Sequence, residues 1–174
     1  MRLLQLRGKA DADARLLTLA EGLTRAAHSS GARLIVNDRA DIARLAGADG
    51  VHVGQDDLPV GDVRAILGPA AMIGLSTHDR DQIDAALAGD ASYVAVGPVF
   101  PTATKDTGYD PRGLDLVRYA ASRGKPVAAI GGITLEQAPA VLAAGASYLA
   151  VISDLLSTAD PEARARDYLR ASTA

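Results

Sequence analysis

The sequence predicts an α/β fold of the TIM (β/α)8-barrel type, and two observations support this prediction. Short runs rich in Val, Ile and Leu alternate along the chain with segments of helical periodicity. One strand and one helix together occupy about 25 residues, the spacing of a (β/α)8 barrel rather than of a larger doubly wound enzyme. Strands that lack polar alternation are typical of parallel strands buried on both faces by right-handed helical crossovers.

Seven strand–helix units are visible in chain order. The expected strands are residues 3–7, 33–37, 50–54, 71–76, 93–100, 126–132 and 148–153. The expected helices are residues 12–30, 39–47, 60–68, 79–89, 113–124, 134–145 and 160–172. We interpret residues 1–174 as a single TIM-barrel-type domain.

A complete barrel has one further unit, and two loops of small residues predict which one is missing. Barrels often bind phosphate on the loops after their last two strands, where the backbone must approach the ligand closely. Here Ala129–Ile133 and Ala150–Asp154 follow the last two visible strands. We therefore expect strands two to eight, with the first unit absent. This expectation raises the questions of whether Met1 is the true start and whether the shortened chain is active.

Composition excludes several classes of protein. The formal net charge is -3 and no run of Lys or Arg stands out, which argues against a general nucleic-acid surface. The chain has no cysteine, so it has neither disulfides nor a thiolate metal site. It also lacks an apolar signal segment or a run of membrane-spanning length. These features favour a cytoplasmic protein without a membrane partner.

The candidate site residues lie at the carboxyl ends of the expected strands, where barrel enzymes build their active sites. From the first four strands they are Gln5, Arg7, Lys9, Asn37, Asp38, Asp57, Ser76 and His78. The loop PTATK adds two hydroxyls and an ammonium, from Thr102, Thr104 and Lys105, a grouping suited to phosphate oxygens. The pattern predicts a small phosphorylated substrate.

Two carboxylates, Asp38 and Asp57, follow neighbouring strands. With phosphates nearby they suit Mg²⁺, which usually takes one or two protein carboxylates plus substrate oxygens. Each residue also has a purely structural interpretation. Asn37 and Asp38 fit a turn or a helix N-cap, Asp57 fits a helix start, and His78 fits an N-cap region. Gly131 and Gly132 fit close packing as well as a phosphate loop.

The motifs together resemble those of the thiamine phosphate synthase family. They are QLRGK, NDR, DGVHVGQDDLP, IGLSTH, YVAVGPVFPTATK, AIGGI and AGASYLAVIS, in this order over residues 2–157. The resemblance implies a transferase that couples hydroxymethylpyrimidine diphosphate to thiazole phosphate, giving thiamine phosphate and diphosphate. In this family the pyrimidine C–O bond breaks first, and the thiazole nitrogen captures the resulting cation.

The resemblance also implies roles for individual residues. Gln5, Arg7, Lys9 and Asn37 would contact the pyrimidine diphosphate, and Asp38 and Asp57 would bind Mg²⁺. Ser76 and Lys105 would act catalytically by holding the leaving diphosphate. The remaining positions, Thr102, Thr104, Gly132 and the backbone of Ile152 and Ser153, would contact the thiazole phosphate.

Two alternatives remain open at this point. Pro111-Arg112-Gly113 is similar to a stretch in the thiazole tautomerases, which share the fold, although that branch has Gly-His where Gly97-Pro98 stands. A shortened chain could instead be a non-catalytic binder of thiazole or thiamine phosphate. Exposed edges of an open sheet would favour pairing in a homo-oligomer.

Overall fold

The structure is a computed structural model that describes residues 2–102 and 108–172, and it confirms the alternation of strands and helices. The strands are β1 (Leu3–Leu6), β2 (Arg33–Asn37), β3 (Gly50–Val53), β4 (Met72–Thr77), β5 (Tyr93–Val96), β6 (Val127–Ile130) and β7 (Tyr148–Ala150). The helices are α1 (Asp13–Ser29), α2 (Ala40–Leu45), α3 (Val60–Leu67), α4 (Arg80–Ala88), α5 (Gly113–Ala121), α6 (Ala138–Ala143), α7 (Ser153–Leu156) and α8 (Pro161–Ala171). The predicted fold class, an α/β fold of the TIM-barrel type, is confirmed.

The chain divides into two compact units. The first runs to Leu75 and includes Gly89–Ser92, and the second contains Ser76–Ala88 and the residues from Tyr93 onward. The interpretation of residues 1–174 as a single domain stays a prediction.

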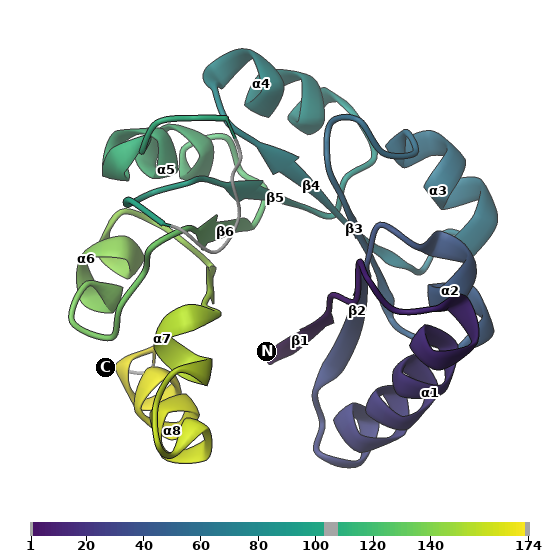
Figure 1. Cartoon of the computed structure of the whole chain (residues 1–174). Helices are drawn as coiled ribbons and strands as arrows, with labels where there is room; N and C mark the ends of the chain where they lie inside the picture. Colours follow the sequence, from purple (N-terminus) through teal and green to yellow (C-terminus); the bar gives the residue numbers. More distant parts are fainter. Residues whose placement is uncertain (1, 103–107, 173–174) are drawn as a thin grey trace. The chain divides into compact units, whose positions relative to one another are not determined.

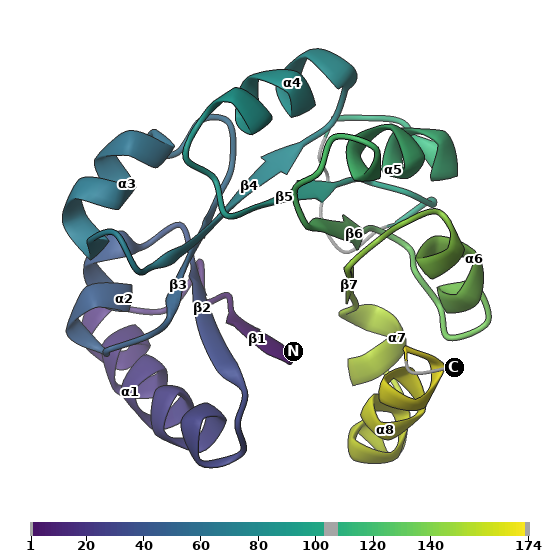
Figure 2. The same ribbon diagram turned by 180° about the vertical axis from the view of Figure 1, so that it is seen from behind.

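In the first unit, the strands pair in parallel and in chain order. β1 pairs with β2, β2 with β3, and β3 with β4. Helices α1, α2 and α3 lie along one side of β1, β2 and β3 (Figures 1 and 2). The core consists of β-branched and aliphatic side chains of the strands, such as Val36, Val51 and Ile73, packed against Ile42 and Val63 of the helices. Because these strands are parallel, their carboxyl ends lie at one edge of the sheet.

In the second unit, β5, β6 and β7 also pair in parallel and in chain order. Val94 and Val127 are fully buried, as are Val117 of α5 and Val141 of α6. Burial of both the strands and the apolar face of each helix is the expected consequence of strands without polar alternation.

Two helical predictions were wrong in detail. Thr134 was expected to start a helix, but α6 begins at Ala138, and the Thr134 N–H instead binds the side chain of Gln137. The sequence does not predict the short helix α7, because it places Ser153 at the end of a strand; that strand stops at Ala150. Within the described residues, no helix combines the length and apolar character needed to cross a bilayer.

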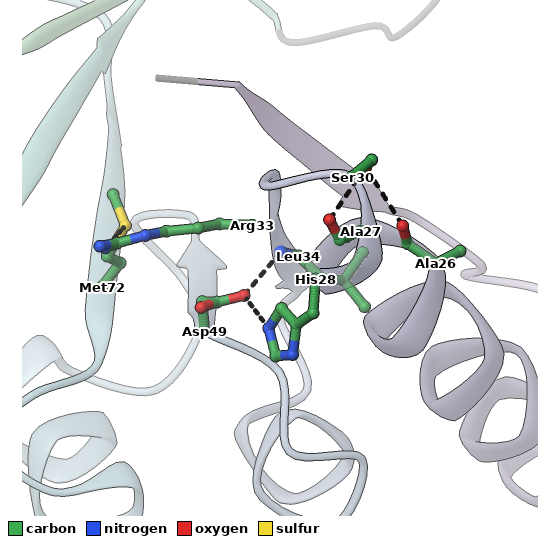
Figure 3. Close-up of polar contacts among 8 residues, drawn as sticks. All are labelled: Ala26, Ala27, His28, Ser30, Arg33, Leu34, Asp49 and Met72. Atoms are coloured by element: carbon green, nitrogen blue, oxygen red, sulfur yellow. Dashed lines mark hydrogen bonds and ion pairs between the residues drawn. The ribbon is translucent and has the colours of Figure 1, made fainter.

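A polar cluster closes the amino ends of β2 and β3. Asp49 precedes β3, and its Oδ2 accepts hydrogen bonds from the Leu34 N–H and contacts His28 Nε2 of α1, both at 2.9 Å (Figure 3). The Asp49 carbonyl accepts the Met72 N–H at 2.9 Å, where β4 begins. One residue therefore ties the end of α1 to β2, β3 and β4 at the edge opposite the carboxyl ends of these strands.

Candidate active site

The carboxyl ends of β1 and β2 bring together two of the predicted site residues. Lys9 Nζ lies 3.0 Å from Asp38 Oδ2, and the side chains are 53% and 22% exposed. Gln5 and Arg7 are exposed residues at the carboxyl end of the same strand, and Asn37 ends β2. The first unit thus collects Gln5, Arg7, Lys9, Asn37 and Asp38 at one sheet edge, as the sequence predicts.

Asp38 has an unusual backbone conformation. Its φ is 61°, and it is the one non-glycine residue among those described with a positive φ. The Arg39 N–H donates to the Asn37 carbonyl at 2.7 Å, which closes a three-residue turn around Asp38. The Asp38 N–H donates to the His52 carbonyl of β3 at 2.8 Å. Non-glycine residues with positive φ cluster at functional sites, where neighbouring contacts hold them.

The same geometry excludes the helix-cap interpretation of these acidic residues. Arg39, not Asn37 or Asp38, occupies the N-cap position of α2, and Pro59 occupies that of α3. Asp57 Oδ2 instead accepts the Gly54 N–H at 2.7 Å, which closes the turn after β3. The turn interpretation of Asp38 therefore holds, and its N-cap interpretation is wrong. Asp57, which was expected at a helix start, lies in the turn after β3, and α3 begins after Pro59.

The donor chemistry of this edge fits Mg²⁺. Asn37 pairs in register with His52, so Asp38 and the Gly54–Asp57 turn leave adjacent strands at the same edge. Two carboxylates are the usual protein contribution when substrate oxygens complete the shell. In the described ranges, no group of three or more His, Cys, Asp and Glu could hold a metal alone. A cation bound here would complete its coordination shell with water or with oxygens of the substrate.

Arg39 forms a network beside Asp38 that was not predicted from the sequence. Its Nε and Nη2 donate to the two oxygens of Asp41, at 2.9 and 2.7 Å, and its Nη1 donates to Asp13 Oδ1 at 2.6 Å. These hydrogen bonds lower the pKa of the Asp41 and Asp13 carboxyls below their usual values. They also raise the pKa of the Arg39 guanidinium. The NDR motif contained this arginine, but its partners could not be predicted. Asp13 is distant in sequence, and Asp41 is an acidic residue in the first turn of a helix.

In the second unit, the end of β4 carries Ser76, which is half-buried, and the buried Thr77, whose hydroxyl donates to the Ala95 carbonyl at 2.9 Å. Asp79 caps α4, because its Oδ1 accepts the Gln82 N–H at 2.8 Å. The Gln82 side chain in turn accepts the His78 N–H at 2.8 Å. Ser76 is therefore a strand residue, and Asp79, not His78, caps α4.

His78 connects β4 to the segment after β5. Its Nδ1 lies 2.6 Å from the Gly97 carbonyl, so this nitrogen carries the proton, and its ring stacks on Tyr109 with centroids 4.3 Å apart. The Arg112 guanidinium lies 4.9 Å from the same Tyr109 ring. Arg112 Nε is buried without a hydrogen-bond partner in the described part of the chain. A shallow cavity of about 250 Å³ is lined by His78, Arg80, Arg112 and their neighbours.

The glycine pair after β6 is explained by close packing. Gly131 and Gly132 have φ values of 98° and 65°, and a Cβ on Gly132 would lie 2.4 Å from the Pro101 carbonyl oxygen. The Phe100 N–H donates to the Gly131 carbonyl at 3.0 Å. This packing fixes the residues that lead to Thr102, which is half-buried. Thr104 and Lys105 lie outside the described residues.

Ile152 and Ser153 are placed by contacts that sequence reasoning missed. Ser153 is the first residue of α7, and both residues are exposed. Asp154 Oδ2 accepts the Tyr168 hydroxyl at 2.6 Å and the Leu135 N–H at 3.3 Å. Burial, together with the adjacent Asp154 carboxylate, raises the pKa of the Tyr168 phenol. Asp154 thus links α7 to α8 and to the loop after β6.

Comparisons with known proteins place this geometry in a family. Residues 1–155 match the sequence model of the family described as thiamine monophosphate synthase. The thiamine-phosphate synthase of Mycobacterium bovis is 53% identical over 161 residues, which cover 91% of this chain and 72% of that protein. The thiamine-phosphate synthase of Mycobacterium sp. strain KMS is 48% identical, covering 94% and 77%.

Solved structures agree with this placement. Thiamine phosphate pyrophosphorylase from Pyrococcus furiosus matches with a TM-score of 0.91 and 28% identity, over 98% of this chain and 82% of that one. A 3-hexulose-6-phosphate synthase matches with a TM-score of 0.70 at 22% identity, which shows the shared fold alone. Family model, relatives and structure agree, and the chain belongs to the thiamine monophosphate synthase family, a family of transferases.

Proposed function

We propose that this chain couples hydroxymethylpyrimidine diphosphate to thiazole phosphate, forming thiamine phosphate and releasing diphosphate with the help of Mg²⁺. The observation that carries the proposal is the Lys9 and Asp38 pair at the carboxyl ends of β1 and β2, 3.0 Å apart. A cation for the diphosphate and a carboxylate for the metal occur together where a barrel enzyme binds its substrate. Membership of the family supports the same reaction.

The first unit would bind the pyrimidine diphosphate. Arg7 and Lys9 supply positive charge, and Gln5 and Asn37 supply amide groups for hydrogen bonds to the substrate. Asp38 and Asp57 would hold Mg²⁺, which when bound neutralises charge that develops on the departing diphosphate. The carboxylates leave the rest of the coordination shell to substrate oxygens and water, as Mg²⁺ prefers.

The second unit would bind the leaving diphosphate and the thiazole phosphate. Ser76 and Lys105 would donate hydrogen bonds to the diphosphate as the pyrimidine C–O bond breaks. Thr102, Thr104, Gly132 and the backbone of Ile152 and Ser153 would hold the thiazole phosphate, so that its ring nitrogen captures the pyrimidine cation. This ionising mechanism asks little acid–base chemistry of the protein, which agrees with a chain that has three histidines and no cysteine.

The test is an assay of the full chain with both substrates and Mg²⁺, in which thiamine phosphate and diphosphate are measured separately. We expect equal amounts of the two products, dependence on both substrates, and loss of turnover with EDTA. Tight binding of thiamine phosphate without turnover would instead support a non-catalytic binder. Isomerisation of a thiazole substrate without the pyrimidine would support the tautomerase alternative. Either of these results would contradict the proposal.

A further inference from the structure

We propose that Arg39 is a positioning residue that holds the turn containing Asp38 and so keeps the Asp38 carboxylate in its metal-binding conformation. The proposal rests on the proposed function, because it takes Asp38 as a ligand of the divalent cation. The side chain of Arg39 hydrogen-bonds Asp41 and Asp13, and the proposed function gives it no contact with the metal or the substrate. Arg39 would act through Asp38 alone.

The turn itself needs support. Asp38 has a φ of 61°, in the left-handed region that side chains other than glycine rarely adopt. Such conformations persist where the surrounding structure over-determines them. Two backbone hydrogen bonds contribute, from Asp38 N–H to His52 and from Arg39 N–H to Asn37. The second of these places the backbone of Arg39 directly in the turn.

The side chain of Arg39 then fixes that backbone on two helices. Two guanidinium nitrogens bind both oxygens of Asp41, in the first turn of α2, and a third binds Asp13, the first residue of α1. Bidentate arginine–carboxylate pairs add geometric specificity that a lysine cannot supply. Arg39 is 35% exposed at its side chain, less than Asp13 and Asp41. The residue after Asp38 is therefore anchored by three side-chain hydrogen bonds to two carboxylates.

This arrangement separates a positioning role from a merely stabilising one. Exposed ion pairs usually contribute little to stability. If Arg39 formed only such pairs, its loss would leave cation binding unchanged. If Arg39 holds the turn, its loss lets Asp38 relax toward a negative φ and moves the carboxylate. Affinity for the cation then falls even where the protein stays folded.

The experiment measures binding of Mn²⁺ alone to the substrate-free full chain by isothermal titration calorimetry, with far-UV circular dichroism as the check of folding. We expect Arg39→Met to weaken Mn²⁺ binding about tenfold, and Arg39→Lys to restore little of it, because lysine lacks the bidentate fork. Asp41→Asn, which keeps Arg39 and weakens the fork, is expected to give an intermediate loss of about threefold. The matched control is Arg118→Met, since Arg118 Nη1 lies 2.6 Å from Asp115 Oδ1 in an exposed pair far along the chain; its Mn²⁺ affinity should be unchanged.

The outcomes distinguish this inference from the metal assignment. If Asp38→Asn abolishes Mn²⁺ binding while Arg39→Met and Asp41→Asn bind like the unaltered chain, the positioning role is wrong and the metal site stands. If Asp38→Asn itself binds Mn²⁺ normally, Asp38 is not a ligand. The metal assignment of Asp38 and the positioning role of Arg39 then both fail. Should Arg39→Met not fold, Asp41→Asn decides the question by the same measurement.

Discussion

Lys9 and Asp38 form an ion pair between the positive group proposed for the diphosphate and the negative group proposed for the metal. An ammonium proposed to bind diphosphate lies 3.0 Å from a carboxylate proposed to bind Mg²⁺, so each neutralises the other when substrate is absent. Lys9 and a divalent cation therefore compete for Asp38. Because the pair is partly exposed, the competition is modest.

A substitution of Lys9 separates these effects. Lys9→Met should raise the affinity of the substrate-free chain for Mn²⁺ by about two- to fivefold, since the competing ammonium is gone. The same substitution should raise the KM for the pyrimidine diphosphate, because a phosphate contact is lost. Titration calorimetry gives the first quantity and steady-state kinetics the second. A fall in Mn²⁺ affinity would contradict the competition.

Lys105 is expected to act in the transition state. Lys105→Ala should lower kcat by more than it raises the KM for the pyrimidine diphosphate, because charge on the leaving diphosphate is largest as the C–O bond breaks. Steady-state kinetics with each substrate varied in turn checks this. A change confined to KM would mean that Lys105 contributes only to binding.

Single residues were predicted from the sequence more easily than their contacts. Lys9, Asp38 and Asp57 were predicted as site residues because the carboxyl ends of parallel strands share one edge. The Lys9–Asp38 contact and the network of Arg39 were not, since they depend on the loop after β1 and on the start of α1. Gly132 carried two interpretations; its close approach to Pro101 supports packing, and its contact with phosphate stays a prediction.

At the scale of elements, Asp49 connects α1, β2 and β4 at the amino ends of the strands. Asp49→Ala removes the acceptor of the Leu34 N–H, on a fully buried residue, and should lower the free energy of unfolding by about 1 to 3 kcal/mol. Urea denaturation followed by circular dichroism measures this change. Turnover per folded molecule should stay unaltered, because the cluster lies at the edge opposite the candidate site.

The matched control is Asp90→Ala. Asp90 is exposed, and its contact with Arg64 uses its backbone carbonyl, which the substitution keeps. Its free energy of unfolding should change by no more than about 0.5 kcal/mol. Equal losses in the two variants would show that the Asp49 hydrogen bonds contribute nothing specific.

Helix α8 supports the segment around Ser153 through Tyr168. Tyr168→Phe removes the hydroxyl that donates to Asp154 at 2.6 Å. We expect a loss of about 1 kcal/mol in unfolding free energy and a higher KM for the thiazole phosphate, because Asp154 is adjacent to Ser153. Tyr119→Phe, which removes a hydroxyl bound to Asp84, serves as the control and should leave that KM unchanged. An unchanged KM in Tyr168→Phe would show that the Tyr168–Asp154 hydrogen bond does not support the segment around Ser153.

Elements were predicted well where periodicity is strong. Helix α1 begins and ends within one residue of its expected bounds because its apolar stripe is long. Helix α7 has four residues and carries no periodic signal, so it was missed. The start of α6 was misplaced because Thr134 and Gln137 form a turn before it, and a turn of this kind resembles a helix cap in sequence.

At the scale of the whole molecule, the fold class followed from repeated strand–helix units, and the family followed from the motifs at their ends. Periodicity is a local property that survives without knowledge of contacts, which explains why the class could be predicted. The chemistry depends on which charged groups the folded strands bring to one edge. The roles of Asp38 and Asp57 toward Mg²⁺ are the part that most needs measurement.

The most direct test follows thiamine phosphate formation by the full chain as Mg²⁺ is varied, in Asp38→Asn, Asp57→Asn and the neighbouring control Asp56→Asn. We expect either site variant to lower kcat/KM by about a hundredfold or to raise the half-saturating Mg²⁺ concentration by a similar factor, because a charged ligand is lost. Asp56→Asn should behave like the unaltered chain. Normal Mg²⁺ dependence in both site variants would contradict the account.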